Sequence, residues 1–160
     1  MSHVGNGDKE QIFDATPYLK LFIDKDGRWF QNGKEIVHET IYRQFCAMLE
    51  KTSSGGYQVR MGRELCAVEV EDAPFVVKGV IEGPHGSISL RLNDGTTELF
   101  DPARFWIGKE NVPYCTIRDG LFHARFSRAA YYQIARHIEA DPDGTEFFFH
   151  FDGKQTRVKQ

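Results

Sequence analysis

One order of strand and turn signals occurs twice in this chain. Residues 22–30, FIDKDGRWF, combine a strand-like run, a basic residue, Asp-Gly and aromatic residues, and residues 115–123, CTIRDGLFH, follow the same scheme. Asp-Gly readily adopts the positive φ that tight hairpins need, so each copy predicts a β-hairpin. A helical pattern and then an apolar strand with a glycine turn follow both copies. We therefore expect a duplicated unit of β-hairpin, helix and β-hairpin.

Two segments have the apolar spacing of amphipathic helices, and these predict helices over 39–51 and 127–140. In the first, Ile41, Phe45 and Met48 recur at intervals of four and three. The second follows Ser127, whose hydroxyl is well suited to cap a helix. Strand signals with polar turns predict β structure over 19–23, 28–31, 57–61, 65–71, 75–81, 87–92, 96–100, 145–151 and 155–158.

The predicted fold class is therefore α+β, with antiparallel sheets and two helices. We expect a flexible lead over residues 1–16. An N-terminal α+β repeat unit then covers 17–72, and a β-rich unit with the second repeat and its helix covers 73–160. Residues 101–112 read as a loose connector within the second unit.

Charge and composition exclude several classes of function. The net charge is −3 and the pI is near 6.1, which argues against a protein that grips duplex nucleic acid through its phosphates. No apolar run approaches the length that spans a bilayer, so no membrane partner is expected. The three cysteines are scattered and make a poor disulfide framework. Together with a polar N-terminus, this predicts a cytoplasmic protein.

No catalytic or metal-binding motif is present. The six histidines lack the spacing of common metal sites, and the serines lie outside any Gly-x-Ser-x-Gly elbow. Phosphate-binding glycine loops are absent as well. We therefore expect no enzyme activity, no catalytic residue, no metal and no cofactor.

Arginines and aromatic residues are the more suggestive groups. Arginines beside the corresponding turns of the two repeats could converge on a phosphate or carboxylate, although a solvated charged face is the commoner use of such residues. They are Arg60, Arg63, Arg118, Arg125 and Arg128. Phe75, Trp106 and Tyr114 could stack a base or fill the core, and core filling is the more frequent role of aromatic residues.

Three motifs in this chain resemble, in order and spacing, the proteobacterial family called domain of unknown function 1285 (DUF1285). They are IDKDGRWFQNG at 23–33, VEVEDAPF at 68–75, and the group Pro113-Tyr114, Arg118 to Leu121 and Ala124-Arg125. The likeness extends from residue 19 to residue 160. The family often has Glu-Lys before the Asp-Ala-Pro-Phe strand, whereas this chain has Glu64-Leu65. If that lysine holds an anion in the family, its role passes to Arg60 or Arg63 here or is absent.

The resemblance implies a duplicated core whose C-terminal half is superficially like a pleckstrin-homology fold, with no established enzyme activity. It also implies binding of a nucleotide-like molecule at the interface of the two halves, in signal transduction. From this analogy and from turn adjacency, the predicted ligand-binding residues are Arg60, Glu64, Asp72, Phe75, Arg118 and Arg125. The alternative is a protein-interaction adaptor that pairs a peptide with an exposed sheet edge and has no small-molecule ligand.

Overall fold

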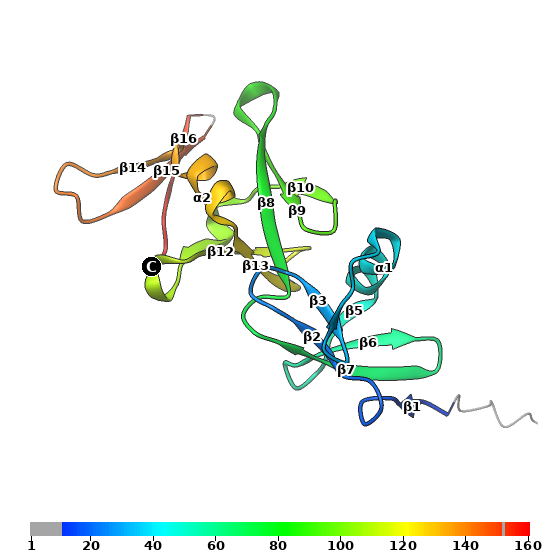
Figure 1. The fold of residues 1–160 in the computed structure, drawn as a ribbon. Coiled ribbons are helices and arrows are strands. Elements are labelled where there is room, and N and C mark those ends of the chain that lie inside the picture. The colour runs from blue at the N-terminus through cyan, green and yellow to red at the C-terminus, as the bar shows by residue number, and fades with distance from the viewer. Residues whose placement is uncertain (1–10, 152) are drawn as a thin grey trace, which may run out of the picture. The chain divides into compact units, whose positions relative to one another are not determined.

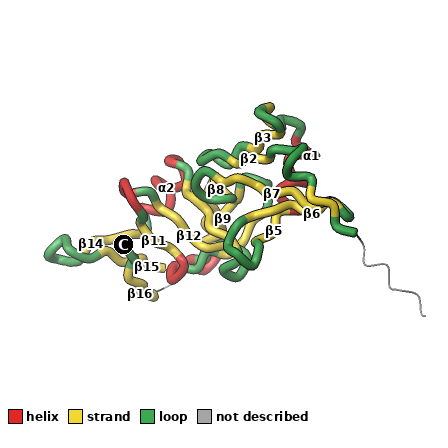
Figure 2. Tube along the Cα trace, turned by 90° about the horizontal axis from the view of Figure 1, so that it is seen from below, coloured by secondary structure: helices red, strands yellow, loops and turns green. Residues whose placement is uncertain are grey.

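A computed structural model describes residues 11–151 and 153–160, which form an α+β protein dominated by strands (Figures 1 and 2). The predicted α+β class with two helices is confirmed, whereas the expectation of antiparallel sheets is wrong, because strands distant in sequence also pair in parallel. The chain divides into two compact units: one contains the chain up to Ile23 and Arg28–Val70, and the other contains Asp24–Gly27 and Glu71–Gln160.

The first unit is a single mixed sheet with one helix. Its elements are β1 (Phe13–Asp14), β2 (Leu21–Ile23), β3 (Trp29–Gln31), β4 (Lys34–Glu35), α1 (Glu39–Met48), β5 (Leu49–Lys51), β6 (Tyr57–Met61) and β7 (Glu64–Val70). The strand order is β4-β3-β2-β7-β6-β5, and β2 pairs with β7 in parallel. β1 pairs in parallel with the start of β7, so a strand lies inside the lead predicted over 1–16. The part of that lead before residue 11 lies outside the described residues.

Helix α1 ends earlier than the sequence predicts. It begins after His38, whose Nδ1 accepts from the Ile41 amide at 3.5 Å, and it buries Phe45 and Cys46. The predicted last turn is instead strand β5, in which Leu49 pairs with Val59 of β6 and stays buried. Leu49 fits the apolar stripe of a helix and the buried face of a strand equally well. The sheet partner therefore decides the conformation.

One face of the first sheet forms the core of this unit. Leu21 and Ile23 are buried, while Phe22 between them is half-buried on the opposite face, as the alternation of a strand requires. Trp29 is fully buried, with its ring centroid 5.5 Å from that of Phe45 on α1.

The second unit contains two sheets and a helix. Its elements are β8 (Phe75–Glu82), β9 (Ile88–Leu92), β10 (Thr97–Leu99), β11 (Phe105–Ile107), β12 (Pro113–Ile117), β13 (Phe122–Phe126), α2 (Arg128–Ala135), β14 (Ile138–Ala140), β15 (Phe147–Phe151) and β16 (Lys154–Arg157), with short 3-10 turns at Pro84–Gly86, Pro102–Arg104 and Lys109–Asn111. The larger sheet has the order β10-β9-β8-β13-β12-β11, and the smaller has the order β14-β15-β16. Strand β11 falls in the segment predicted to be a loose connector.

Ser127 caps α2 as predicted, since its Oγ accepts from the Ala130 amide at 3.2 Å. The helix stops at Ala135 instead of running to 140, because Ile138–Ala140 pair with β15. Gln133 ties the helix to the sheet: its Oε1 accepts from the Val80 amide at 2.8 Å. The register of the β8–β9 pair shifts between Val77 and Gly79 of β8, next to Val80.

Aromatic rings fill the core of the second unit. Phe105 is fully buried and makes edge-to-face contacts with Phe149 at 4.9 Å and with Phe126 at 5.3 Å between centroids. Phe100 contacts Phe105 at 6.1 Å and Phe149 at 5.4 Å. Edge-to-face pairs of this kind add to the free energy gained by burial.

The two larger sheets share one topology. In each, a three-stranded meander precedes a helical segment and a second three-stranded meander, and the first and last strands pair in parallel, β2 with β7 and β8 with β13. The repeat predicted from the sequence corresponds to β12 to β16, which has two strands before its helix where the first unit has β2, β3 and β4. There, however, β14, β15 and β16 form a sheet of their own.

Candidate functional site

The six predicted binding residues fall in both units. Arg60 lies on β6 and Glu64 begins β7 in the first unit, whereas the second unit contains Asp72, Phe75, Arg118 and Arg125. The structure brings the last four together as two pairs, Arg118 with Phe75 and Arg125 with Asp72.

Arg60 and Glu64 are exposed residues of the first sheet. Arg60 Nη2 lies 3.3 Å from Glu50 Oε1, in a pair whose two side chains are about equally open to water. Exposed pairs of this kind contribute little to stability. Glu64 lies opposite Met61 at the start of the β6–β7 hairpin.

Arg118 is held in the β12–β13 hairpin by contacts to the chain itself. Its Nη2 lies 2.6 Å from Oδ2 of the buried Asp94, and its amide donates to the Glu98 carboxylate at 3.2 Å. The guanidinium carbon lies 4.5 Å from the ring centroid of Phe75, which has no exposed surface. The turn needs positive φ at three successive residues, with 50° at Arg118, 56° at Asp119 and 85° at Gly120. These contacts give Arg118 and Phe75 a structural role.

Arg125 and Asp72 form a second, more open pair. Arg125 Nη1 lies 2.9 Å from Asp72 Oδ2, and both side chains are a little over one quarter exposed. The Tyr114 hydroxyl donates to the same carboxylate, at 3.0 Å from Oδ1 and 2.9 Å from Oδ2. Tyr114 and Arg125 come from facing positions on β12 and β13, so the sheet register places them side by side.

An aromatic cluster continues from Tyr114 across the same sheet. The ring of Trp106 on β11 stacks on Tyr114 at 5.6 Å with an interplanar angle of 17°, and His123 on β13 meets Trp106 edge-on at 5.0 Å. Trp106 and Tyr114 are half-buried and His123 is exposed. We call Trp106, Tyr114 and His123 the aromatic platform.

The environment favours the protonated forms of the polar groups beside this platform. Burial and then the hydrogen bond to Asp72 raise the pKa of Tyr114, so its hydroxyl remains a donor at neutral pH. Burial lowers the pKa of Arg125, but the hydrogen bond and charge of Asp72 outweigh it and the pKa is raised overall. The site therefore presents a fixed cation, a fixed carboxylate and three rings.

Cys115, next to Tyr114 on β12, points into the core, and burial raises its pKa to about 12. A raised thiol pKa stabilises the folded state below the unfolded pKa of 9.0, and this contribution is lost as the pH rises from there towards 12. We expect the free energy of unfolding of the parent protein to fall between pH 7.5 and pH 10. In Cys115→Ala this fall should be smaller by about 1.4 kcal/mol. Urea titrations at the two pH values measure this difference. Cys46→Ala, which removes another buried thiol, serves as the comparison, and an equal drop in the Cys115→Ala and parent proteins would contradict the assignment.

No group of histidine, cysteine, aspartate and glutamate residues suited to a metal ion occurs within residues 11–151 and 153–160. Nor does any helix in this part of the chain have the length and apolar character needed to cross a membrane.

Two solved structures of DUF1285 family proteins share this architecture. The protein from Silicibacter pomeroyi DSS-3 has a TM-score of 0.70 and 20% sequence identity, over 89% of this chain and 80% of its own. The protein from Shewanella baltica OS155 has a TM-score of 0.64 and 21% identity, over 76% of this chain and 94% of its own. The chain has the DUF1285 fold. No family model matches the sequence, and no curated protein matches it either.

The DUF1285 fold agrees with the resemblance found in the sequence motifs and supports assignment to that family. Of the predicted binding residues, Asp72 and Arg125 adjoin the aromatic platform. Sequence reasoning considered Trp106 and Tyr114 for stacking but missed His123. Trp106, Tyr114 and His123 lie on three adjacent strands, β11, β12 and β13, and this placement is the signal that links them. It could be used only with the knowledge that residues 105–107 form a strand.

Proposed function

We propose that this DUF1285-fold protein is a non-enzymatic binding module for a planar, anionic, nucleotide-like ligand, acting in signal transduction. The observation that carries the proposal is the half-buried stack of Trp106 on Tyr114 beside the Asp72–Arg125 pair. We place the ligand on the platform of the second unit. The position between the two halves inferred from the family resemblance, and roles for Arg60, Glu64, Phe75 and Arg118, stay predictions.

Ring stacking would supply most of the affinity. Stacking of a base on an aromatic side chain contributes roughly 1–3 kcal/mol and tolerates different bases, because every base has a π face. Trp106 and Tyr114 are already ordered by contact with each other, so less side-chain entropy is lost when a ligand binds. Edge groups of a base could then donate to the Asp72 carboxylate.

Arg125 would recognise the anionic part of the ligand. A guanidinium has five N–H donors, and the ion pair with Asp72 uses Nη1. Asp72 also neutralises part of the local charge, so we expect a ligand with few negative charges to be preferred over a polyanion.

The proposal extends to the history of the fold. The shared order of the two larger sheets supports an ancestral duplication of a meander–helix–meander unit. This repeat relates β2–β7 to β8–β13, whereas the hairpin–helix–hairpin unit predicted from the sequence has its second copy in β12–β16. A pleckstrin-like C-terminal half remains part of the proposal through the family resemblance, and a cytoplasmic location through the polar N-terminus and the scattered cysteines.

Intrinsic fluorescence tests the platform directly, because the chain has two tryptophans and Trp29 is fully buried. Mononucleotides and cyclic dinucleotides are tested in parallel. We expect at least one of them to quench the fluorescence of Trp106 in a saturable way. Arg125→Met should weaken its binding at least tenfold, whereas Arg157→Met, at an exposed arginine of the same unit paired with Glu146, should leave binding unchanged. The affinity is measured by calorimetry.

Trp106→Leu should remove the quenching and weaken binding by about 5- to 150-fold, as expected for the loss of 1–3 kcal/mol of stacking. Binding that persists unchanged in both Trp106→Leu and Arg125→Met would reject this site. No saturable response to any member of the nucleotide panel would reject the nucleotide-like ligand class.

The adaptor function has one observation in its favour. Strand β10 is the last strand of the larger sheet in the second unit, and Leu99 on it is 73% exposed. An extended peptide could pair with such an edge. Leu99→Asp would then abolish partner binding while leaving Trp106 fluorescence and nucleotide binding unchanged, which separates the two functions.

A further inference from the structure

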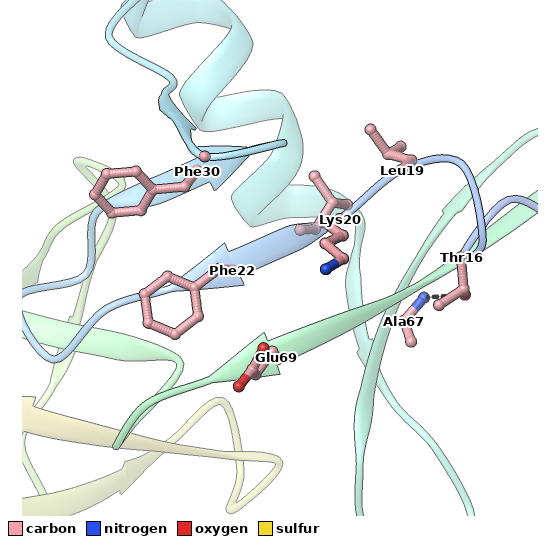
Figure 3. Close-up of a pocket in the computed structure, with 9 residues that line it drawn as sticks. Thr16, Leu19, Lys20, Phe22, Phe30, Ala67 and Glu69 are labelled. Carbon is pink, nitrogen blue, oxygen red and sulfur yellow. Dashed lines mark hydrogen bonds between the residues drawn. The ribbon is translucent and has the colours of Figure 1, made fainter.

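A second candidate binding site lies within the first unit, whereas the platform residues all belong to the second. A pocket of about 500 Å³ opens on the sheet, and its lining includes Leu19, Lys20, Phe22, Phe30, Ala67 and Glu69 (Figure 3). We call it the sheet pocket. Its volume is in the range of small-molecule sites.

An interruption in the sheet creates one wall of the pocket. β7 pairs with β1 at its beginning and with β2 at its end, and residues 15–20 leave the ladder between them. The Ala67 amide therefore donates to a side chain, the Thr16 Oγ1 at 3.0 Å (Figure 3). Asn32 closes the segment: its Oδ1 accepts from the Lys20 amide, and its own amide donates to the Lys20 carbonyl, both at 2.8 Å. The wall is thus held by specific hydrogen bonds.

The floor of the pocket is aromatic and apolar. Phe22 and Phe30 face each other across β2 and β3, with ring centroids 5.9 Å apart. Both are half-buried on the sheet face opposite the buried Leu21 and Ile23. Ala67 adds a small side chain beside them, which leaves room above the sheet.

Two opposite charges border this floor without neutralising each other. Within the described residues, neither the Lys20 ammonium nor the Glu69 carboxylate has a hydrogen bond or ion pair, and Figure 3 shows both at the pocket with no bond between them. Glu69 lies opposite Phe22 in the sheet register, and Lys20 precedes β2 on the same face. The pocket therefore offers an anion site and a cation site across an apolar floor.

We propose that the sheet pocket binds a small zwitterion with an apolar body, of the size of an apolar dipeptide. A fatty carboxylate would pair with Lys20 but would leave Glu69 without a cation, and an apolar amine would leave Lys20 without an anion. A zwitterion places its carboxylate at Lys20 and its ammonium at Glu69, while its side chains cover the Phe22–Phe30 pair. The site is independent of the proposed nucleotide-like ligand.

The probe is the dipeptide leucyl-phenylalanine, compared with its N-acetyl and C-terminal amide derivatives, each of which lacks one charge. We expect saturable shifts of the Thr16 and Ala67 amide signals by NMR, with a dissociation constant near or below about 1 mM. Each derivative should bind at least fivefold more weakly than the dipeptide, since a charge-assisted contact contributes about 1 kcal/mol or more.

Matched variants assign each charge to its partner. Lys20→Met should weaken binding of the dipeptide at least fivefold but leave binding of the amide derivative unchanged. Glu69→Gln should also weaken binding of the dipeptide at least fivefold, but it should leave binding of the N-acetyl derivative unchanged. Lys51→Met and Glu39→Gln, at exposed residues of the same unit that do not line the pocket, are the controls. Unperturbed amide signals elsewhere show that each variant is folded.

The absence of saturable shifts at millimolar dipeptide would overturn the proposal. Equal binding of all three probes would also overturn it, because charge would then play no part. A change of oligomeric state in Lys20→Met or Glu69→Gln would assign the pocket to a second copy of the chain instead, and would equally reject the zwitterion.

Discussion

Replacing Asp94 with alanine is expected to lower the free energy of unfolding by about 3 kcal/mol. Asp94 is buried in the β9–β10 turn, where Oδ2 binds the Arg118 guanidinium at 2.6 Å. Its Oδ1 accepts from the Thr96 amide at 3.0 Å and from Thr96 Oγ1 at 2.6 Å. Removing the carboxylate leaves these donors without their acceptor, and it leaves the Arg118 charge unpaired above Phe75.

The measurement is a urea titration followed by far-UV circular dichroism. Asp101→Ala is the control, because Asp101 is exposed and its ion pair with Arg104 is longer, at 3.5 Å. We expect that variant to lose no more than about 1 kcal/mol. An Asp94→Ala variant as stable as the Asp101→Ala variant would show that the Arg118 network does not hold the two hairpins.

Replacing Phe105 with alanine should lower the free energy of unfolding by about 4 kcal/mol. The side chain is fully buried and its ring contacts three other phenylalanines, at centroid distances of 4.9 to 6.1 Å. The change removes apolar contacts from a core that cannot collapse fully around the space left behind. The resulting cavity adds to the lost transfer free energy.

Phe105→Leu is expected to lose less than half as much unfolding free energy as Phe105→Ala, because leucine retains most of the buried volume. Tyr132→Ala provides a surface control, since Tyr132 on α2 is 65% exposed. Chemical denaturation of the three variants ranks them directly. Losses of similar size in Phe105→Ala and Tyr132→Ala would mean that β11 contributes little to the core.

The two arginines of the second unit have different roles for a physical reason. Arg118 binds a buried carboxylate and stacks on a buried ring, so its substitution should affect stability first. Arg125 pairs with the partly exposed Asp72 at the edge of the platform, so its substitution should affect binding first. The sequence pattern puts both beside turns of the second repeat and cannot separate their roles, because burial depends on which strands become neighbours.

Local sequence determined the elements whose causes are local. Asp-Gly at residues 26–27 and 119–120 supplies positive φ for the predicted hairpins, and the Ser127 hydroxyl caps α2. Gly27 shows why one turn disfavours a side chain: φ is 78°, which strains other residues, and a Cβ would lie 3.0 Å from Val76 Cγ2. The alternation along β6, β7 and β9 likewise predicts their buried faces from side-chain type alone.

Tertiary structure decided the features that depend on distant partners. Leu49–Lys51 and Ile138–Ala140 became strands because β6 and β15 offered backbone partners, although both segments continue a helical pattern. The parallel pairs of β2 with β7 and of β8 with β13 join segments far apart in the chain. The platform arises from the register of β11, β12 and β13, and the sheet pocket from that of β2, β3 and β7, and each register brings residues from several strands onto one face. Periodicity states which residues share a face of one strand, whereas only the pairing of strands determines which faces meet.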